Sequence, residues 1–153
     1  EFLGNLMLFF TGLSRYATQI AEKKIANLPN RQSHVNKMIA MVAEAEGILQ
    51  DTRAPLSDIG KLLHDSWSLK KELAKEISPP EVDEIYQAAR DAGALGGKLL
   101  GAGGGGFMLF YAEPDAQAKI RQSLVHLTEV HFDVDHVGSK IVVYEPDGLE
   151  SRN

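Results

Sequence analysis

The segment between residues 96 and 107 reads Gly96-Gly97-Lys98-Leu99-Leu100-Gly101-Ala102-Gly103-Gly104-Gly105-Gly106-Phe107, and it holds seven of the 14 glycines of the chain. Glycine loses more backbone freedom on folding than any other residue, so four in succession require a specific reason. Either several positions adopt a positive φ, or a ligand or another backbone approaches too closely for a Cβ atom. Successive backbone amides in such a loop also form a concave site for anions, and phosphate is the usual occupant.

Two glycine motifs of nucleotide-binding proteins do not fit this segment. Gly101, Gly103 and Gly106 match the spacing G-x-G-x-x-G, but the Rossmann motif needs a helix after the loop, and the apolar residues 107–111 predict a strand. The Walker A motif ends in Gly-Lys-Ser/Thr, whereas Phe107 follows Gly106. The alternative that stays open is a flexible hairpin turn, although hairpins usually need one or two glycines rather than four.

The sequence on either side of this loop predicts an α+β fold. A continuous apolar run predicts a strand over residues 5–11 that is covered on both faces. Apolar residues at spacings of three and four then predict four helices before the loop and a fifth after it. The expected helices cover 13–28, 33–50, 55–75, 78–93 and a segment that starts at Pro114, and the strands after the loop cover 107–112, 130–137 and 140–145. With two helices treated as an insertion, this order predicts a ferredoxin-like antiparallel sheet with an enlarged helical layer.

The fourth of these helices carries a local start signal in Ser78-Pro79-Pro80-Glu81. We expect the Ser78 hydroxyl to accept a hydrogen bond from the Glu81 amide, and the Glu81 carboxylate to accept one from the Ser78 amide. Pro79 would then occupy the first helical position, where its missing N–H costs nothing.

The composition is that of an ordinary globular chain, with 44% hydrophobic and 24% charged residues, which excludes a disordered protein. The absence of cysteine excludes disulfides and a cysteine nucleophile, and it fits a reducing compartment, so we expect a cytoplasmic protein. The net charge of −5 gives no support to nucleic acid or an anionic membrane as a partner. Apolar runs such as Leu6 to Phe10 are far shorter than the ~20 residues that a membrane span needs.

The segment from Gly97 to Phe107 resembles the third sequence motif of the galactokinase, homoserine kinase, mevalonate kinase and phosphomevalonate kinase (GHMP) superfamily. Its setting also agrees, with a helix before it and a strand after it. The likeness extends from Leu6 to Tyr144, and three further runs resemble the bacterial heptose 7-phosphate kinase branch: Phe10-Thr11-Gly12-Leu13-Ser14-Arg15, Leu63-His64-Asp65-Ser66-Trp67 and Ala94-Leu95-Gly96-Gly97-Lys98. Leu100 departs from the pattern, because many members of the family have Ser or Thr there.

The resemblance implies an ATP- and Mg²⁺-dependent kinase that acts on a sugar or sugar phosphate, such as a heptose 7-phosphate. It also implies that residues 1–153, which begin without Met, form a single C-terminal domain. The family's nucleotide-binding motif, catalytic acidic residue and Mg²⁺ ligands belong to an N-terminal domain, so we expect no catalytic residue in this chain. Two alternatives stay open: a non-catalytic ligand-binding regulatory module, and a substrate-binding partner of a separate N-terminal chain.

Several residues are candidates for contacts with a phosphate or a sugar. Lys98 precedes the loop and could neutralise a phosphate, although a solvated strand lysine is the plain alternative. Ser14 and Arg15 follow the first strand at an expected helix start, where an anion is favoured. Trp67 could stack on a sugar ring and Lys70 lies on the same side of the third helix, although a lone Trp is more often a core residue.

Three histidines, His126, His131 and His136, are spaced by five, with Asp133 and Asp135 between the last two. This spacing matches no zinc motif, and an alternation of polar residues is typical of the solvated face of a sheet. We therefore expect no metal site in this chain.

Overall fold

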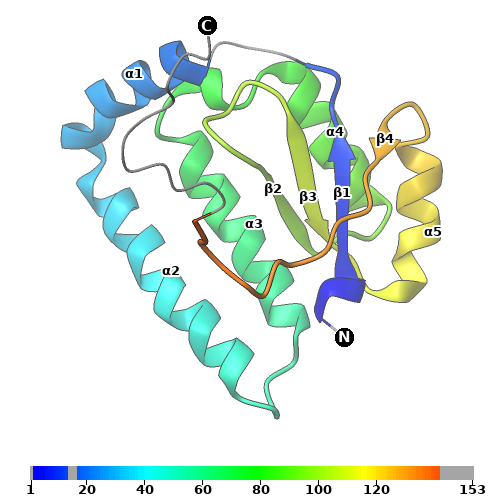
Figure 1. Ribbon diagram of the computed structural model, residues 1–153. Helices are drawn as coiled ribbons and strands as arrows, with labels where there is room; N and C mark the ends of the chain where they lie inside the picture. The colour runs from blue at the N-terminus through cyan, green and yellow to red at the C-terminus, as the bar shows by residue number, and fades with distance from the viewer. Residues whose placement is uncertain (1, 14–16, 142–153) are drawn as a thin grey trace, which may run out of the picture.

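The computed structural model describes residues 2–13 and 17–141, and within these residues four strands form one antiparallel sheet in the order β2-β3-β1-β4 (Figure 1). The strands are β1 (Leu6–Phe10), β2 (Gly96–Leu99), β3 (Phe107–Tyr111) and β4 (Thr128–Glu129). Both β1 and β2 pair antiparallel with β3, so they run in the same direction on either side of it. This split β-α-β arrangement is that of ferredoxin-like folds, and it confirms the predicted fold class.

Four α-helices of the described part of the chain lie between β1 and β2, and a fifth lies between β3 and β4, as predicted. They are α1 (Ala17–Asn27), α2 (Gln32–Gln50), α3 (Ser57–Lys71), α4 (Pro80–Asp91) and α5 (Pro114–Ser123). Short 3₁₀ helices cover Phe2–Asn5, Leu28–Arg31 and Lys75–Ile77. None of the helices among residues 2–13 and 17–141 has the length and hydrophobicity needed to cross a membrane.

The core lies between the sheet and the helices α4 and α5, which cover its rear face in Figure 1. Met7 and Phe9 of β1 point into this core, where Phe9 meets the ring of Phe110 of β3 at 6.1 Å. The alternate residues of β1 face the other way, and Phe10 there is 40% exposed. The prediction that this strand is covered on both faces therefore holds only in part, because Leu6 and Leu8 on the second face are half-buried and Phe10 is exposed.

Helix α3 runs beside the edge strand β2, and their backbones touch through two glycines. A Cβ atom on Gly96 of β2 would overlap the carbonyl oxygen of Gly60 of α3. A Cβ atom on Gly60 would in turn lie 2.7 Å from Cβ of Leu95 and 2.8 Å from Cδ1 of Tyr111. Only residues without a side chain allow α3 to lie this close to the sheet, and this contact sets the position of the whole helix.

The predicted capping box at the start of α4 is absent. The helix begins at Pro80, the residue before it is Pro79, and Ser78 stands outside the helix with an extended backbone (φ −126°, ψ 92°). From that position the Ser78 hydroxyl donates to Oδ1 of Asp83 at 2.9 Å instead of accepting from the Glu81 amide. The helix starts one residue later than predicted, which moves Ser78 out of reach of the amide it was expected to cap.

The predicted strand over residues 130–137 is also wrong. The ladder between β1 and β4 covers only Thr128 and Glu129, followed by one hydrogen bond from the Val130 amide to the Leu8 carbonyl at 2.8 Å. Beyond it, the carboxylates of Asp133 and Asp135 accept hydrogen bonds from the amides of Val134 and Val137. These local bonds compete with a ladder for the same backbone donors. The final predicted strand has no ladder at residues 140 and 141, and residues 142–145 lie outside the described residues.

Candidate functional site

The glycine loop between β2 and β3 needs its glycines for backbone conformation. The φ angles are +73° at Gly101, +123° at Gly103, +78° at Gly104 and +107° at Gly106, a region that other residues rarely adopt. The expectation of positive φ at several positions is therefore confirmed. The loop lies at the end of the sheet where β1 ends (Figure 1).

The loop also packs against the chain's own backbone. A Cβ atom on Gly103 would lie 2.8 Å from Cα of Ile77, and one on Gly105 would lie 2.5 Å from the carbonyl oxygen of Leu13. The amide of Gly104 donates to the Ile77 carbonyl at 2.9 Å, and that of Gly106 donates to the Leu13 carbonyl at 3.1 Å. Of the two close approaches considered for this segment, the approach of another backbone accounts for Gly103 and Gly105.

Thr11 joins the end of β1 to the end of the loop. Its amide donates to the Gly106 carbonyl at 2.8 Å, and its hydroxyl both donates to that carbonyl and accepts from the Gly106 amide, at 2.9 and 3.1 Å. The hydroxyl also accepts from the Leu13 amide at 3.2 Å. Sequence reasoning assigned no role to Thr11; the only signal was its place in the run from Phe10 to Arg15.

Four amides of the loop have no acceptor within the described residues, and three of them belong to residues that are not buried. In residues 2–13 and 17–141 we find no acceptor for the backbone N–H groups of Gly101, Ala102, Gly103 and Gly105. Successive amides of this kind suit an anion with several oxygens, such as a phosphate. The described part of the chain does not bring three His, Cys, Asp or Glu side chains together for a metal ion, so this end of the sheet offers amides and cations rather than a carboxylate cluster.

Lys70 of α3 reaches the first part of the loop. Its side chain is buried, and Nζ donates to the carbonyls of Leu99 and Gly101 at 3.0 and 2.8 Å. Burial, followed by the positive charges of Lys98 on β2 and Lys24 on α1, lowers the pKa of Lys70 to about 8. Of the predicted candidates, Lys70 therefore contacts the loop directly, and Lys98 acts on Lys70 electrostatically.

The other predicted candidates are not placed at this site. Trp67 is completely buried, with its ring 6.3 Å from that of Tyr86, so neither ring face is open to a sugar. Its core position agrees with the plain interpretation of a lone Trp. Ser14 and Arg15 lie outside the described residues, and their predicted contacts with an anion stay predictions.

The pKa of Lys70 predicts how stability depends on pH. The folded protein releases this proton near pH 8, whereas the unfolded chain holds it up to about the ordinary value of 10.5. The unfolded state binds more protons between these values, so stability should rise with pH in this window. Urea denaturation measures the unfolding free energy of the wild type and of Lys70→Met. Between pH 7.5 and 10.5, the wild type should gain ~1–2 kcal/mol of stability relative to Lys70→Met, allowing for solvent screening. A difference that stays constant would mean that Lys70 is not buried as a cation.

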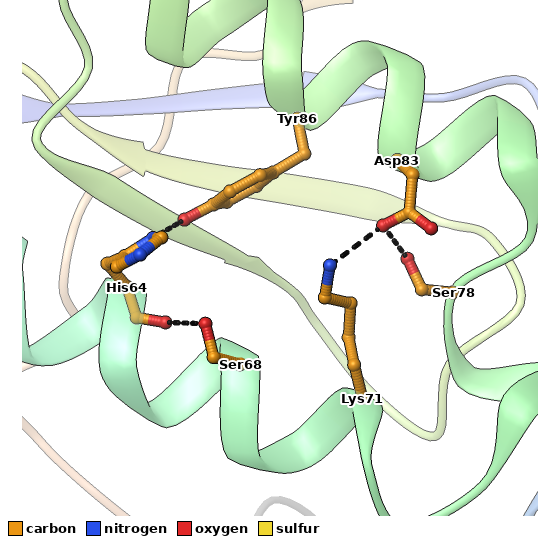
Figure 2. Close-up of polar contacts among 6 residues, drawn as sticks. All are labelled: His64, Ser68, Lys71, Ser78, Asp83 and Tyr86. Carbon is orange, nitrogen blue, oxygen red and sulfur yellow. Dashed lines mark hydrogen bonds and ion pairs between the residues drawn. The ribbon is translucent and has the colours of Figure 1, made fainter.

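A second polar cluster joins α3 to α4 (Figure 2). Nδ1 of His64 lies 2.7 Å from the hydroxyl of Tyr86, and the two rings stack at 6.1 Å. Burial raises the pKa of Tyr86 to about 12, so the phenol stays protonated at neutral pH. Nζ of Lys71 donates to Oδ1 of Asp83 at 3.0 Å. Each of these side chains is engaged with its neighbour, so the cluster holds two helices together.

Comparison with known proteins agrees with this geometry. The family profile described as "GHMP kinases C terminal" matches residues 48–126. The chain is 33% identical over 125 residues to D-glycero-alpha-D-manno-heptose 7-phosphate kinase of Campylobacter jejuni, which covers 81% of this chain and 37% of that protein. It is 32% identical over 121 residues to L-fucokinase/L-fucose-1-P guanylyltransferase of Bacteroides fragilis, covering 77% of this chain and 13% of that protein.

Solved structures show the same fold. The mevalonate kinase of Methanococcus jannaschii superimposes with a TM-score of 0.68 at 23% identity, covering 84% of this chain and 39% of that one. The mevalonate kinase of L. major gives a TM-score of 0.68 at 22% identity, covering 81% and 40%. The chain therefore spans well under half the length of these proteins. On the profile match, the identity to kinases and the shared fold, the chain belongs to the C-terminal family of the GHMP kinases.

Proposed function

We propose that this chain is the C-terminal domain, over residues 1–153, of an ATP- and Mg²⁺-dependent kinase for a sugar or sugar phosphate, with a heptose 7-phosphate as the preferred substrate class. The observation that carries the proposal is the glycine loop, which follows Lys98 in the chain, binds Lys70 through the Gly101 carbonyl, and has four amides without an acceptor in the described residues. The relative from Campylobacter jejuni, which carries the name of such a kinase, supports the substrate class.

In this proposal the loop and its lysines work by position and charge. Phosphoryl transfer needs little covalent help from the protein, and it depends on orienting the phosphates and on stabilising their negative charge. ATP with Mg²⁺ supplies the phosphoryl group when bound, and the residues that hold the metal ion and remove the substrate proton belong to the rest of the protein. The amides of Ala102 and Gly105 would donate to phosphate oxygens, while Lys98 would neutralise charge.

The proposal predicts that residues 1–153 alone transfer no phosphate. The isolated chain should show no turnover with ATP, Mg²⁺ and a panel of sugar phosphates, whereas the full-length protein should turn over at ~1 s⁻¹ or faster with at least one of them. A far-UV circular dichroism spectrum serves as the control that the isolated chain is folded. Turnover by the isolated chain at that rate would contradict the division of the site between two domains, and an inactive full-length protein would favour the regulatory-module alternative.

A further inference from the structure

Lys70 meets the loop at the point where β2 ends. Leu99 is the last residue of the strand and Gly101 is the first glycine of the loop, and the ammonium group binds the carbonyls of both. Between them, the Leu100 amide donates to the Phe107 carbonyl at 2.8 Å and closes the hairpin. The two carbonyls on either side of Leu100 thus point toward α3, while its N–H points toward β3.

The Leu99 carbonyl needs this donor. β2 is an edge strand of the described sheet, with β3 on one side and α3 on the other, and Leu99 is completely buried. A buried carbonyl without a hydrogen bond costs about 1–3 kcal/mol. A helix cannot supply a backbone donor sideways, because its own N–H groups are bound within the helix. The ammonium of Lys70 donates two hydrogen bonds at this position. This need for a donor explains why a charged group is buried between Trp67 and the end of β2.

Three contacts then determine where the loop lies. Lys70 holds its beginning, Ile77 holds Gly104 in its middle, and Leu13 with Thr11 holds Gly106 at its end. The middle is held by a backbone group, and the end is held by backbone groups together with the Thr11 hydroxyl. The beginning is held by one side chain, and this beginning carries the unengaged amides of Gly101 and Ala102.

We propose that Lys70 is a positioning residue that fixes the first turn of the glycine loop, and thereby the direction in which the Gly101 and Ala102 amides point. This inference rests on the proposed function only for its consequence in catalysis. The charged groups that act on Lys70 are Lys98 from β2 and Lys24 from α1, and the ring of Trp67 lies 5.7 Å from Nζ. Both are lysines, whose ammonium groups also donate hydrogen bonds, but in the structure Nζ of Lys70 is the donor to the two carbonyls.

Hydrogen exchange in the full-length protein tests the positioning role without any assay of activity. In Lys70→Met, which keeps a similar volume but has no donor, the amide of Leu100 should exchange at least tenfold faster than in the wild type. Lys70→Arg should restore part of the protection, because a guanidinium also offers several donors. Lys71→Met is the matched control, since the neighbouring Lys71 binds Asp83 and does not touch the loop. Unchanged exchange of Leu100 in Lys70→Met, at wild-type stability, would overturn the inference.

Kinetics of the same variants separate positioning from general stability. Lys70→Met should lower kcat by tenfold or more at a temperature where its circular dichroism matches the wild type, and Lys71→Met should lower kcat by less than threefold. An equal loss in both variants would show that Lys70 acts only through the stability of α3 and would overturn the inference. If the wild type phosphorylates no sugar while Leu100 is deprotected in Lys70→Met, the proposed function fails and the positioning role stands.

Discussion

Gly96→Val should destabilise the protein severely. The Cβ atom of the new side chain would overlap the carbonyl oxygen of Gly60. The Gly60 backbone is held in a helix and the Gly96 backbone in the sheet. Relief requires α3 to move away from β2, which opens the contact around Trp67 and Leu95. We expect a loss of more than ~4 kcal/mol, against a total stability of about 5–15 kcal/mol for a domain of this kind. Urea denaturation followed by circular dichroism measures it, and Gly96→Ala should give a smaller loss of the same sign.

Gly47 provides the matched control. It lies inside α2, and a Cβ atom there would meet nothing within 4 Å. Gly47→Ala should therefore stabilise the protein by about 0.5–1 kcal/mol, because alanine loses less backbone freedom in a helix. Wild-type stability in Gly96→Val would mean that α3 does not lie against β2 as described.

Gly104→Val should reduce kcat/KM of the full-length protein by a factor of about 100 or more. The φ of +78° at this position is unfavourable for any β-branched residue, so the loop must change its conformation or bear strain of ~1–3 kcal/mol. Either outcome displaces the amides on both sides. The loss of one well-placed donor to developing negative charge typically costs 10²–10³ in rate, so activity should fall far more than stability.

Gly101→Ala serves as a comparison for Gly104→Val, because it introduces backbone strain without a side chain that meets other atoms. Its φ of +73° is equally unfavourable, but Gly101 is exposed and a Cβ atom there would meet nothing within 4 Å. We expect a similar strain of ~1 kcal/mol and a fall in kcat/KM of less than tenfold. Steady-state kinetics and thermal denaturation on both variants decide the question. Full activity in Gly104→Val would mean that the loop only connects two strands of a hairpin and does not bind phosphate.

Much of the fold followed from local patterns. Apolar residues at helical spacing predicted each helix to within a few residues, and the run of glycines predicted either positive φ at several positions or a close approach, both of which occur. The failures at Ser78 and at residues 130–137 come from local side-chain hydrogen bonds, which a hydrophobic pattern does not reveal. The Ser78 hydroxyl donates to Asp83 instead of accepting from the Glu81 amide, because Pro79 separates Ser78 from the start of the helix.

The candidate site was predictable in its loop but not in its surroundings. Lys70 was singled out as a possible ligand for a substrate, yet its two acceptors lie 29 and 31 residues further along the chain. Thr11 and Gly106 are 95 residues apart. No periodicity encodes such pairs. Trp67 was singled out as a possible contact for a sugar, but it is a core residue, because Tyr86 of α4 packs against its ring.

The pairing of β1 with β3 also has a consequence for synthesis on the ribosome. Asn5 at the start of β1 donates to the hydroxyl of Tyr111, 106 residues later, and β1 pairs with β3 along its full length. At about 5–20 residues per second, the apolar segment Leu6–Phe10 leaves the ribosome roughly 5–20 s before its partner exists. An unpaired apolar strand is a template for aggregation during that interval. The yield of folded protein is therefore set by whatever binds this strand first, and slower synthesis at low temperature lengthens its exposure.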